Sequence, residues 1–257
     1  MHVEKWYLDC VTAAGAGMIG YAARIRLGPL AVPCSETLTW RADDPARHHH
    51  TVIGGRRPTA MSEEVIWRNS ALTVDGRWRR RGLAIAPLVL HAEAAGQVQW
   101  TCLCPAAQVA VTVDGEPYAG AGYAERLVMT LPPGRLSLRE LRWGRFISDE
   151  QSCVWIQWRG AAERTWCFHN GQAAHATMSG LHDLAWNGHR LKLHPGALLR
   201  TGRVADTGRQ HAGLLRWLLP ATVRRLRETK WCSRGLLTDD HGREHAGWAI
   251  HEVALFP

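Results

Sequence analysis

Short runs in which apolar and polar residues alternate occupy most of the chain. Successive side chains of a strand point to opposite faces, so each alternating run predicts a strand with one buried face. So many short strands predict an all-β protein built of antiparallel sandwiches or barrels. The predicted strands span residues 5–10, 18–26, 36–40, 64–68, 71–74, 84–92, 98–104, 107–113, 124–130, 153–159, 164–169, 183–186, 190–194 and 246–255.

Paired turn residues separate many of these runs. An aspartate or asparagine followed by glycine tolerates the left-handed backbone that a two-residue hairpin turn requires. Each pair between two apolar runs therefore predicts an antiparallel hairpin. The pairs are Asp75-Gly76, Asp114-Gly115, Asn170-Gly171 and Asn187-Gly188, and His241-Gly242 marks a further turn.

The length of 257 residues suffices for one large β domain or for two smaller ones with separate cores. Residues 71–78 and 183–190 share a strand–turn–strand pattern, which is expected of two related β halves. The double proline Pro132-Pro133 marks the junction between them. We therefore predict an N-terminal β domain of residues 1–131 and a C-terminal β domain of residues 132–257.

One segment has helical instead of strand periodicity. Residues 212–227 carry apolar side chains at spacings of three and four, and Pro220 interrupts them. The segment predicts a short helix that serves as a lid or connector on a barrel. Its mixture of arginine and leucine leaves contact with a membrane surface as an alternative.

Composition narrows the class of protein. Hydrophobic residues make up 46% of the chain, but no run of eighteen apolar residues predicts a membrane-spanning helix, and the N-terminus lacks the pattern of a secretory signal. The seven scattered cysteines are typical of reduced thiols, so we expect a cytoplasmic protein. The net charge of +8 is spread along the chain without a nucleic-acid-binding module, so no nucleic-acid partner is expected.

Motifs for metals and cofactors are missing from the sequence. His48-His49-His50 is interpreted as a polar loop, and His241 and His245 lie among turn-forming glycines, so neither set predicts a metal site. The sequence contains no phosphate loop, dinucleotide fingerprint or nucleophile elbow. An enzyme of this sequence is therefore expected to work without a cofactor.

Five motifs, in their order along the chain, resemble those of the carotenoid 1,2-hydratase and AttH-like proteins. The motifs are Glu4-Lys5-Trp6-Tyr7-Leu8-Asp9, Gly122-Tyr123-Ala124-Glu125, Leu141-Arg142-Trp143-Gly144-Arg145, Trp155-Ile156-Gln157-Trp158 and Gly247-Trp248-Ala249-Ile250-His251-Glu252-Val253. The resemblance extends from one end of the chain to the other. It implies two lipocalin-like β domains, an apolar pocket and a hydrophobic small-molecule substrate. Enzymes of this family add water across isoprenoid double bonds, and more distant relatives are cyclases and pericyclases.

Hydration or cyclisation of an alkene begins with protonation at carbon, by an acid that is aimed at the double bond. A carboxylic acid in an apolar pocket retains its proton near neutral pH, and tryptophan faces stabilise the cation that forms. Glu125 in the Gly-Tyr-x-carboxylate motif is the first candidate, with Tyr123 as its hydrogen-bond partner. Glu252 is the second, and Asp9 and Glu36 follow.

The remaining candidates would bind the substrate. The predicted pocket wall consists of Trp143, Trp155 and Trp158, and Arg145 would bind an anionic group of the ligand. A structural ion pair of Glu125 with a nearby arginine is an equally good interpretation of that carboxylate. A pericyclase that only folds its substrate, and a carrier without catalytic activity, remain alternatives. The sequence does not predict an oligomeric state.

Overall fold

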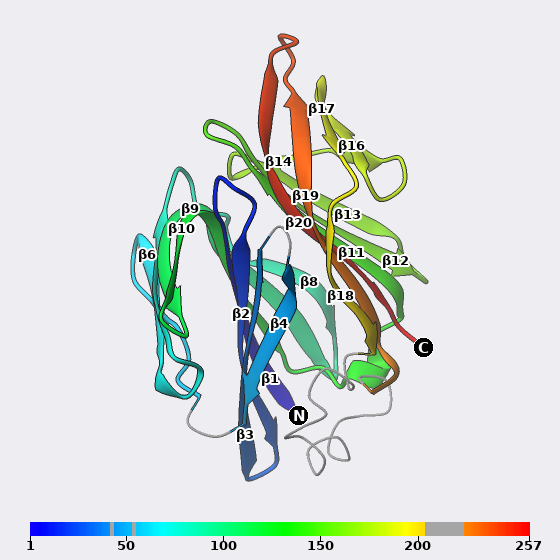
Figure 1. The fold of residues 1–257 in the computed structure, drawn as a ribbon. Coiled ribbons are helices and arrows are strands. Elements are labelled where there is room, and N and C mark those ends of the chain that lie inside the picture. The colour runs from blue at the N-terminus through cyan, green and yellow to red at the C-terminus, as the bar shows by residue number, and fades with distance from the viewer. Residues whose placement is uncertain (42–43, 53–54, 204–223) are drawn as a thin grey trace. The chain divides into compact units, whose positions relative to one another are not determined.

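The computed structural model describes residues 1–41, 44–52, 55–203 and 224–257. Strands dominate the described residues and form two antiparallel sheets of ten strands each (Figure 1). The prediction of an all-β fold is confirmed. The described residues divide into two compact units, residues 1–136 and residues from 137 onward, and each unit contains one of the sheets.

The first sheet runs in the order β4-β3-β2-β1-β10-β9-β7-β6-β5, and β8 also pairs with β9. Strand pairing is continuous from β4 to β9, with register shifts between β3 and β4 and between β9 and β10. Side chains of directly paired residues lie on the same face of the sheet. Its strands are β1 (His2–Val11), β2 (Gly17–Leu27), β3 (Leu30–Arg41), β4 (Asp44–Thr51), β5 (Thr59–Ala60), β6 (Glu64–Asn69), β7 (Val74–Arg80), β8 (Leu88–Glu93), β9 (Gly96–Val113) and β10 (Glu116–Met129).

The second sheet repeats this order with every strand number raised by ten: β14-β13-β12-β11-β20-β19-β17-β16-β15, with β18 on β19. The same order of ten strands in both sheets indicates an internal duplication. The strands are β11 (Leu138–Ile147), β12 (Ser152–Gly160), β13 (Arg164–His169), β14 (Gln172–Ala174), β15 (Ala176–Met178), β16 (Asp183–Trp186), β17 (His189–Leu193), β18 (Ala197–Arg203), β19 (Arg227–Thr238) and β20 (Glu244–Leu255).

Each unit has its own hydrophobic core on one face of its sheet. In the first unit, Trp6, Leu8 and Cys10 alternate along β1 and pack with Trp67 and Trp78. The core of the second unit includes Phe146, Cys153, Trp155, Trp186 and Leu237. Burial of large aromatic side chains stabilises each core, because the hydrophobic effect scales with the apolar area removed from water.

Three of the predicted hairpin turns form as expected. Both residues of Asp114-Gly115, Asn170-Gly171 and Asn187-Gly188 have positive φ, and each pair joins two adjacent antiparallel strands. The turn predicted at Asp75-Gly76 is wrong, because both residues lie within β7. The chain reverses instead through a 3-10 turn at Ser70–Leu72, where the Asn69 side chain accepts hydrogen bonds from the backbone N–H groups of Ala71 and Leu72. The strand predicted at residues 71–74 is therefore wrong for most of its length.

Several other elements differ from the sequence-based expectation. The three histidines 48–50 lie in β4 and not in a loop. Residues 98–104 and 107–113 belong to one long strand, β9, and the sequence did not reveal β11 or β19. Most of the predicted helical segment at 212–227 lies outside the described residues, but Arg227 begins β19.

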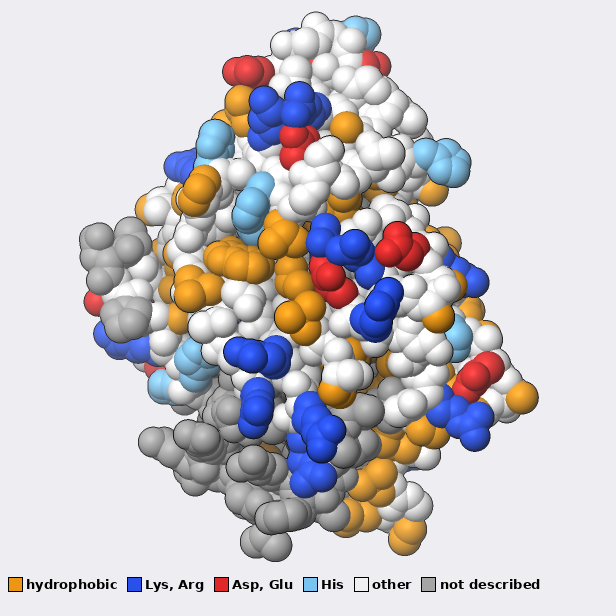
Figure 2. All heavy atoms as spheres, turned by 90° about the vertical axis from the view of Figure 1, so that its right-hand side faces the viewer, with side chains coloured by type: hydrophobic (Ala, Val, Ile, Leu, Met, Phe, Trp, Pro, Cys, Tyr) orange, Lys and Arg blue, Asp and Glu red, His pale blue; other side chains and the backbone are white. Residues whose placement is uncertain are grey.

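No helix in the described ranges has the length and apolar character needed to cross a membrane. On the face shown in Figure 2, lysine and arginine side chains lie in several separate groups, with apolar side chains between them. The net positive charge is therefore not gathered into one continuous stripe on that face.

Candidate functional site

Glu125 lies in the middle of β10, between Tyr7 of β1 and Cys102 of β9 in the register of the sheet. Two neutral donors hold its carboxylate by the same oxygen, Oε2. The Trp100 indole N–H donates at 2.5 Å and the Tyr123 hydroxyl at 2.7 Å. A β-bulge beside Glu125 shifts the register between β9 and β10. This shift brings Trp100 and Cys102 to the same face as Glu125.

Tyr123 and Cys102 remain protonated at neutral pH. Burial raises the pKa of the Tyr123 hydroxyl well above its usual value of 10.0, and the neighbouring Cys102 and Glu125 raise it further. Burial likewise raises the pKa of the Cys102 thiol well above 9.0. Tyr123 is fully buried, so its hydroxyl is fixed as a donor to the Glu125 carboxylate.

Aromatic rings line the same face beside Glu125. The Tyr7 ring makes edge contacts with Tyr21 and Tyr123, with ring centroids 5.4 Å and 6.0 Å apart. All three tyrosines are at least 92% buried. The Lys5 ammonium lies 5.1 Å from the centre of the Tyr21 ring. Rigid, water-poor aromatic surface around a carboxylate is the environment that chemistry on an apolar alkene needs.

The row that contains Glu125 continues across the sheet. Tyr7 is opposite Tyr21 on β2, Tyr21 is opposite Glu36 on β3, and Glu36 is opposite His50 on β4. Asp9 belongs to the next row, opposite Tyr123, and is fully buried. The structure therefore brings four of the predicted residues onto one face of the first sheet: Glu125, Tyr123, Asp9 and Glu36.

Glu252 lies on the second sheet, in a different electrostatic environment. It forms an ion pair with Lys230, whose side chain is 1% exposed. The Lys230 ammonium lies 3.6 Å from Glu228 and 5.6 Å from the centre of the Trp143 ring. Because its nearest polar partner is the buried Lys230 ammonium, Glu252 suits a structural ion pair better than proton donation.

The predicted substrate-binding residues of the second unit do not share one face. Trp143, Trp158 and Arg145 occupy the face that carries Glu252. Trp155 points the other way, into the core with Phe146. Its ring covers Gly144, where an added Cβ would come within 2.2 Å of the indole. Trp155 therefore belongs to the core of the second unit, on the face opposite to Trp143 and Trp158.

Arg145 is fully buried and donates a hydrogen bond of 2.8 Å to the backbone carbonyl of Trp248. None of the four predicted carboxylates is exposed: Asp9 is buried, and Glu36, Glu125 and Glu252 are partly buried. The candidate residues thus form two groups, one on each sheet. Glu125 and its donors form the group that fits proton transfer.

Sequence reasoning missed Trp100, Cys102, Tyr7, Tyr21 and Lys230. Tyr7 and Tyr21 lie in strands that the alternation predicts, but only strand pairing shows that they share a face with Glu125. The bulge in β9 could not be derived from residue types. Lys230 was missed because the whole of β19 was missed.

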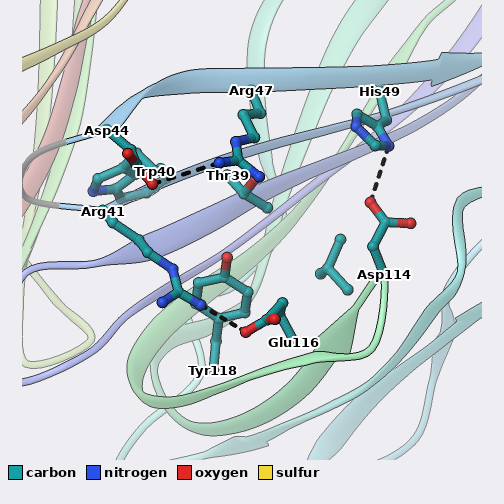
Figure 3. A pocket seen from close by; sticks show the side chains of 10 residues that line it. Thr39, Trp40, Arg41, Asp44, Arg47, His49, Asp114, Glu116 and Tyr118 are labelled. Carbon is teal, nitrogen blue, oxygen red and sulfur yellow. Dashed lines mark hydrogen bonds and ion pairs between the residues drawn. The ribbon is translucent and has the colours of Figure 1, made fainter.

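One surface cavity of about 480 Å³ lies beside β3, β4 and β10 in the first unit (Figure 3). Arg41 pairs with Glu116 and Arg47 with Asp44, and the His49 ring lies 2.9 Å from the Asp114 carboxylate. A second cavity of about 470 Å³ is lined by Glu4, Trp6, Arg126 and residues 56–59. Neither cavity includes Glu125. In the described part of the chain, no three His, Cys, Asp or Glu side chains are grouped to hold a metal ion.

Comparison with known proteins identifies the fold. No protein-family profile and no curated sequence matches the chain. Solved structures do match the chain. CghA in complex with Sch210972 matches it with a TM-score of 0.60 at 10% identity, and the match covers 99% of this chain and 88% of the CghA chain. Kievitone hydratase from Nectria haematococca has a TM-score of 0.58 at 11% identity, covering 98% and 88%.

A putative AttH from Nitrosomonas europaea has a TM-score of 0.57 at 11% identity, covering 98% of this chain and 92% of its own. These structures share the carotenoid hydratase-like arrangement of two lipocalin-type β units. The chain described here has that fold. At this level of identity the likeness shows the fold alone.

Proposed function

We propose that the protein is an enzyme that acts on a hydrophobic isoprenoid or polyketide-type metabolite by acid-assisted hydration, cyclisation or isomerisation of a C=C bond. Glu125 supplies or guides the proton. The observation that carries the proposal is the Glu125 carboxylate, held by the Tyr123 hydroxyl and the Trp100 indole on an aromatic, water-poor face. One of the structures with this fold is named kievitone hydratase, and this name agrees with the proposal.

The residues divide the work as follows. Glu125 in its acid form protonates the alkene carbon, and its carboxylate later accepts a proton from the attacking water or from the adjacent carbon. Tyr123 and Trp100 fix the carboxyl orientation, because both donate to Oε2. The faces of Tyr7 and Tyr21 stabilise the developing carbocation through their quadrupoles. The reaction needs no cofactor for these steps.

Deuterium incorporation tests the proposal directly. The full-length protein is incubated in D₂O with a panel of linear isoprenoid and polyene alkenes, and the products are analysed by mass spectrometry. Proton transfer to carbon places a non-exchangeable deuterium in the product. Hydration also adds the mass of water, whereas cyclisation and isomerisation do not.

The Glu125→Gln variant should lower the turnover of any converted alkene by roughly 10²–10⁴-fold, which is the range of general acid catalysis. Glu116→Gln is the matched control. It changes an exposed carboxylate on the same strand, paired with Arg41, and should leave turnover unchanged. Full activity of the Glu125 variant would remove Glu125 from the mechanism.

A pericyclase is the second candidate function. The observation that favours it is the rigid edge-to-face row of Tyr7, Tyr21 and Tyr123, a surface against which a polyene can be folded. Such an enzyme would convert its substrate without deuterium incorporation and would tolerate Glu125→Gln. Tight binding of an alkene without any product would instead identify a carrier.

A further inference from the structure

The cavity of about 470 Å³ in the first unit differs in charge from the one in Figure 3. Three arginines line it, Arg56, Arg57 and Arg126, together with a single carboxylate, Glu4. Three positive charges and one negative charge leave a net charge of +2. In the Figure 3 cavity, by contrast, both lining arginines lie beside an acidic side chain.

Among the residues that the structure describes, two of the three guanidinium groups have no acidic partner. Glu4 forms an ion pair with Arg57 and also accepts a hydrogen bond from the Trp6 indole N–H at 3.2 Å. Among the described residues, no carboxylate lies within ion-pair distance of Arg56 or Arg126. The Nε atom of Arg126 is buried and has no hydrogen-bond partner among those residues. A buried donor without an acceptor is costly, and an anion in the cavity would satisfy it.

The walls of the cavity are fixed by the fold. Trp6 is 4% exposed, belongs to the core and lies beneath Arg126, whose guanidinium carbon is 5.7 Å from the centre of the indole. The backbone carbonyl of Arg56 accepts a hydrogen bond of 2.8 Å from the Trp67 indole. Pro58 is buried and removes freedom from the segment that leads into β5. The arginines are therefore attached to rigid backbone.

We propose that this cavity binds a phosphate-class anion, either free or as the phosphate or diphosphate group of a small metabolite. Guanidinium groups reach it from two elements, β10 and the segment 56–59. A planar carboxylate occupies one guanidinium fork, whereas a phosphate offers at least three oxygens to several forks at once. A phosphate charge of about −2 matches the net charge of the cavity.

This site is independent of the function proposed above. Arg126 follows Glu125 directly in β10, so their side chains point to opposite faces of the sheet. Anion binding is also measured without a substrate. The failure of one proposal would therefore leave the other standing.

Calorimetric titration of the full-length protein with sodium pyrophosphate, at low ionic strength and against sodium chloride of equal ionic strength, tests the proposal. Saturable binding is expected, and added salt should weaken it. Arg126→Gln should lower the affinity by about tenfold or more, since it removes a charge-assisted hydrogen-bond donor. Arg68→Gln is the matched control, because it removes an exposed arginine of the same sheet outside the cavity. The affinity of the Arg68→Gln variant for pyrophosphate should remain within about twofold of that of the wild type.

Two further variants keep the test decisive. Arg56→Gln changes an exposed residue and gives the answer if Arg126→Gln does not fold. Glu4→Gln raises the net charge of the cavity and releases Arg57, so pyrophosphate affinity should increase. Absence of saturable binding, or equal losses in the Arg126 and Arg68 variants, would overturn the site. Citrate binding as tight as pyrophosphate would overturn its assignment to phosphate.

Discussion

Glu125 and Glu252 occupy equivalent positions in the two halves of the chain. Glu125 lies four residues after Ala121 of β10, which pairs with Val11 at the end of β1. Glu252 lies four residues after Trp248 of β20, which pairs with Ile147 at the end of β11. Each is also opposite an aromatic residue, Tyr7 or Trp143. The duplication has therefore kept the carboxylate and changed its partners, from neutral Tyr123 and Trp100 to the Lys230 cation.

This difference predicts unequal losses of stability. Glu252→Gln leaves Lys230 buried without its closest counter-charge, so the free energy of unfolding should fall by about 3 kcal/mol. Glu125→Gln retains an acceptor for Tyr123 and Trp100 and should cost about 1 kcal/mol or less. Urea denaturation followed by tryptophan fluorescence measures both. Equal losses would show that the two carboxylates have the same structural role.

Tyr123→Phe should lower kcat/KM for any converted alkene by about 10- to 100-fold, because the variant loses the hydroxyl that orients the Glu125 carboxylate. Steady-state kinetics on the best substrate of the panel would measure this loss. Tyr118→Phe is the control: it removes a hydroxyl from the other face of the same strand, where Tyr118 belongs to the core. A loss of activity in the control as large as in Tyr123→Phe would indicate a general structural effect.

His251 predicts a loss of stability in mild acid. Burial, together with the nearby His182 and Lys230, lowers its pKa from 6.5 to about 3. The native protein therefore keeps His251 neutral, hydrogen-bonded to the Ser233 hydroxyl at 3.0 Å, while the unfolded chain binds a proton below pH 6.5. The contribution is complete above pH 6.5 and is lost progressively as the pH falls toward 3.

Between pH 6.5 and 5 this group alone should lower the free energy of unfolding by about 2 kcal/mol, since one proton contributes about 1.4 kcal/mol for each pH unit. Urea titrations across this range, with His251→Gln as the test and exposed His241→Gln as the control, measure the effect. The slope should flatten only in the His251 variant. An unchanged slope in that variant would show that His251 titrates normally.

Gly144→Ala should destabilise the second unit by about 1–3 kcal/mol, because the new methyl group would overlap the Trp155 ring. The overlap makes the two sites interdependent. In the double variant with Trp155→Phe, the smaller ring leaves room for the methyl group. The loss of stability in the double variant should therefore be smaller than the sum of the losses in the two single variants. Thermal unfolding of both single variants and the double variant gives the coupling. Strict additivity would contradict the contact.

The sequence by itself determined the fold class and three of the hairpin turns. Alternation of apolar and polar residues is a local property, and Asn-Gly and Asp-Gly turns depend on the backbone preferences of two residues. Strands and these turns can therefore be predicted from the sequence. Asp75-Gly76 shows the limit of this reasoning. The same dipeptide stands inside β7, because pairing with β6 and β9 outweighs its local turn preference.

The sequence predicted only part of the candidate site. The sequence indicated Glu125, Tyr123, Asp9 and Glu36, but strand order and register decided that they share a face, and the β9 bulge decided that Trp100 reaches Glu125. The tertiary structure also separated Trp155 from Trp143 and Trp158, and paired Glu252 with a lysine 22 residues away. Such contacts join strands that are distant in the chain. Their geometry depends on the pairing of whole strands, which no local pattern of residues records.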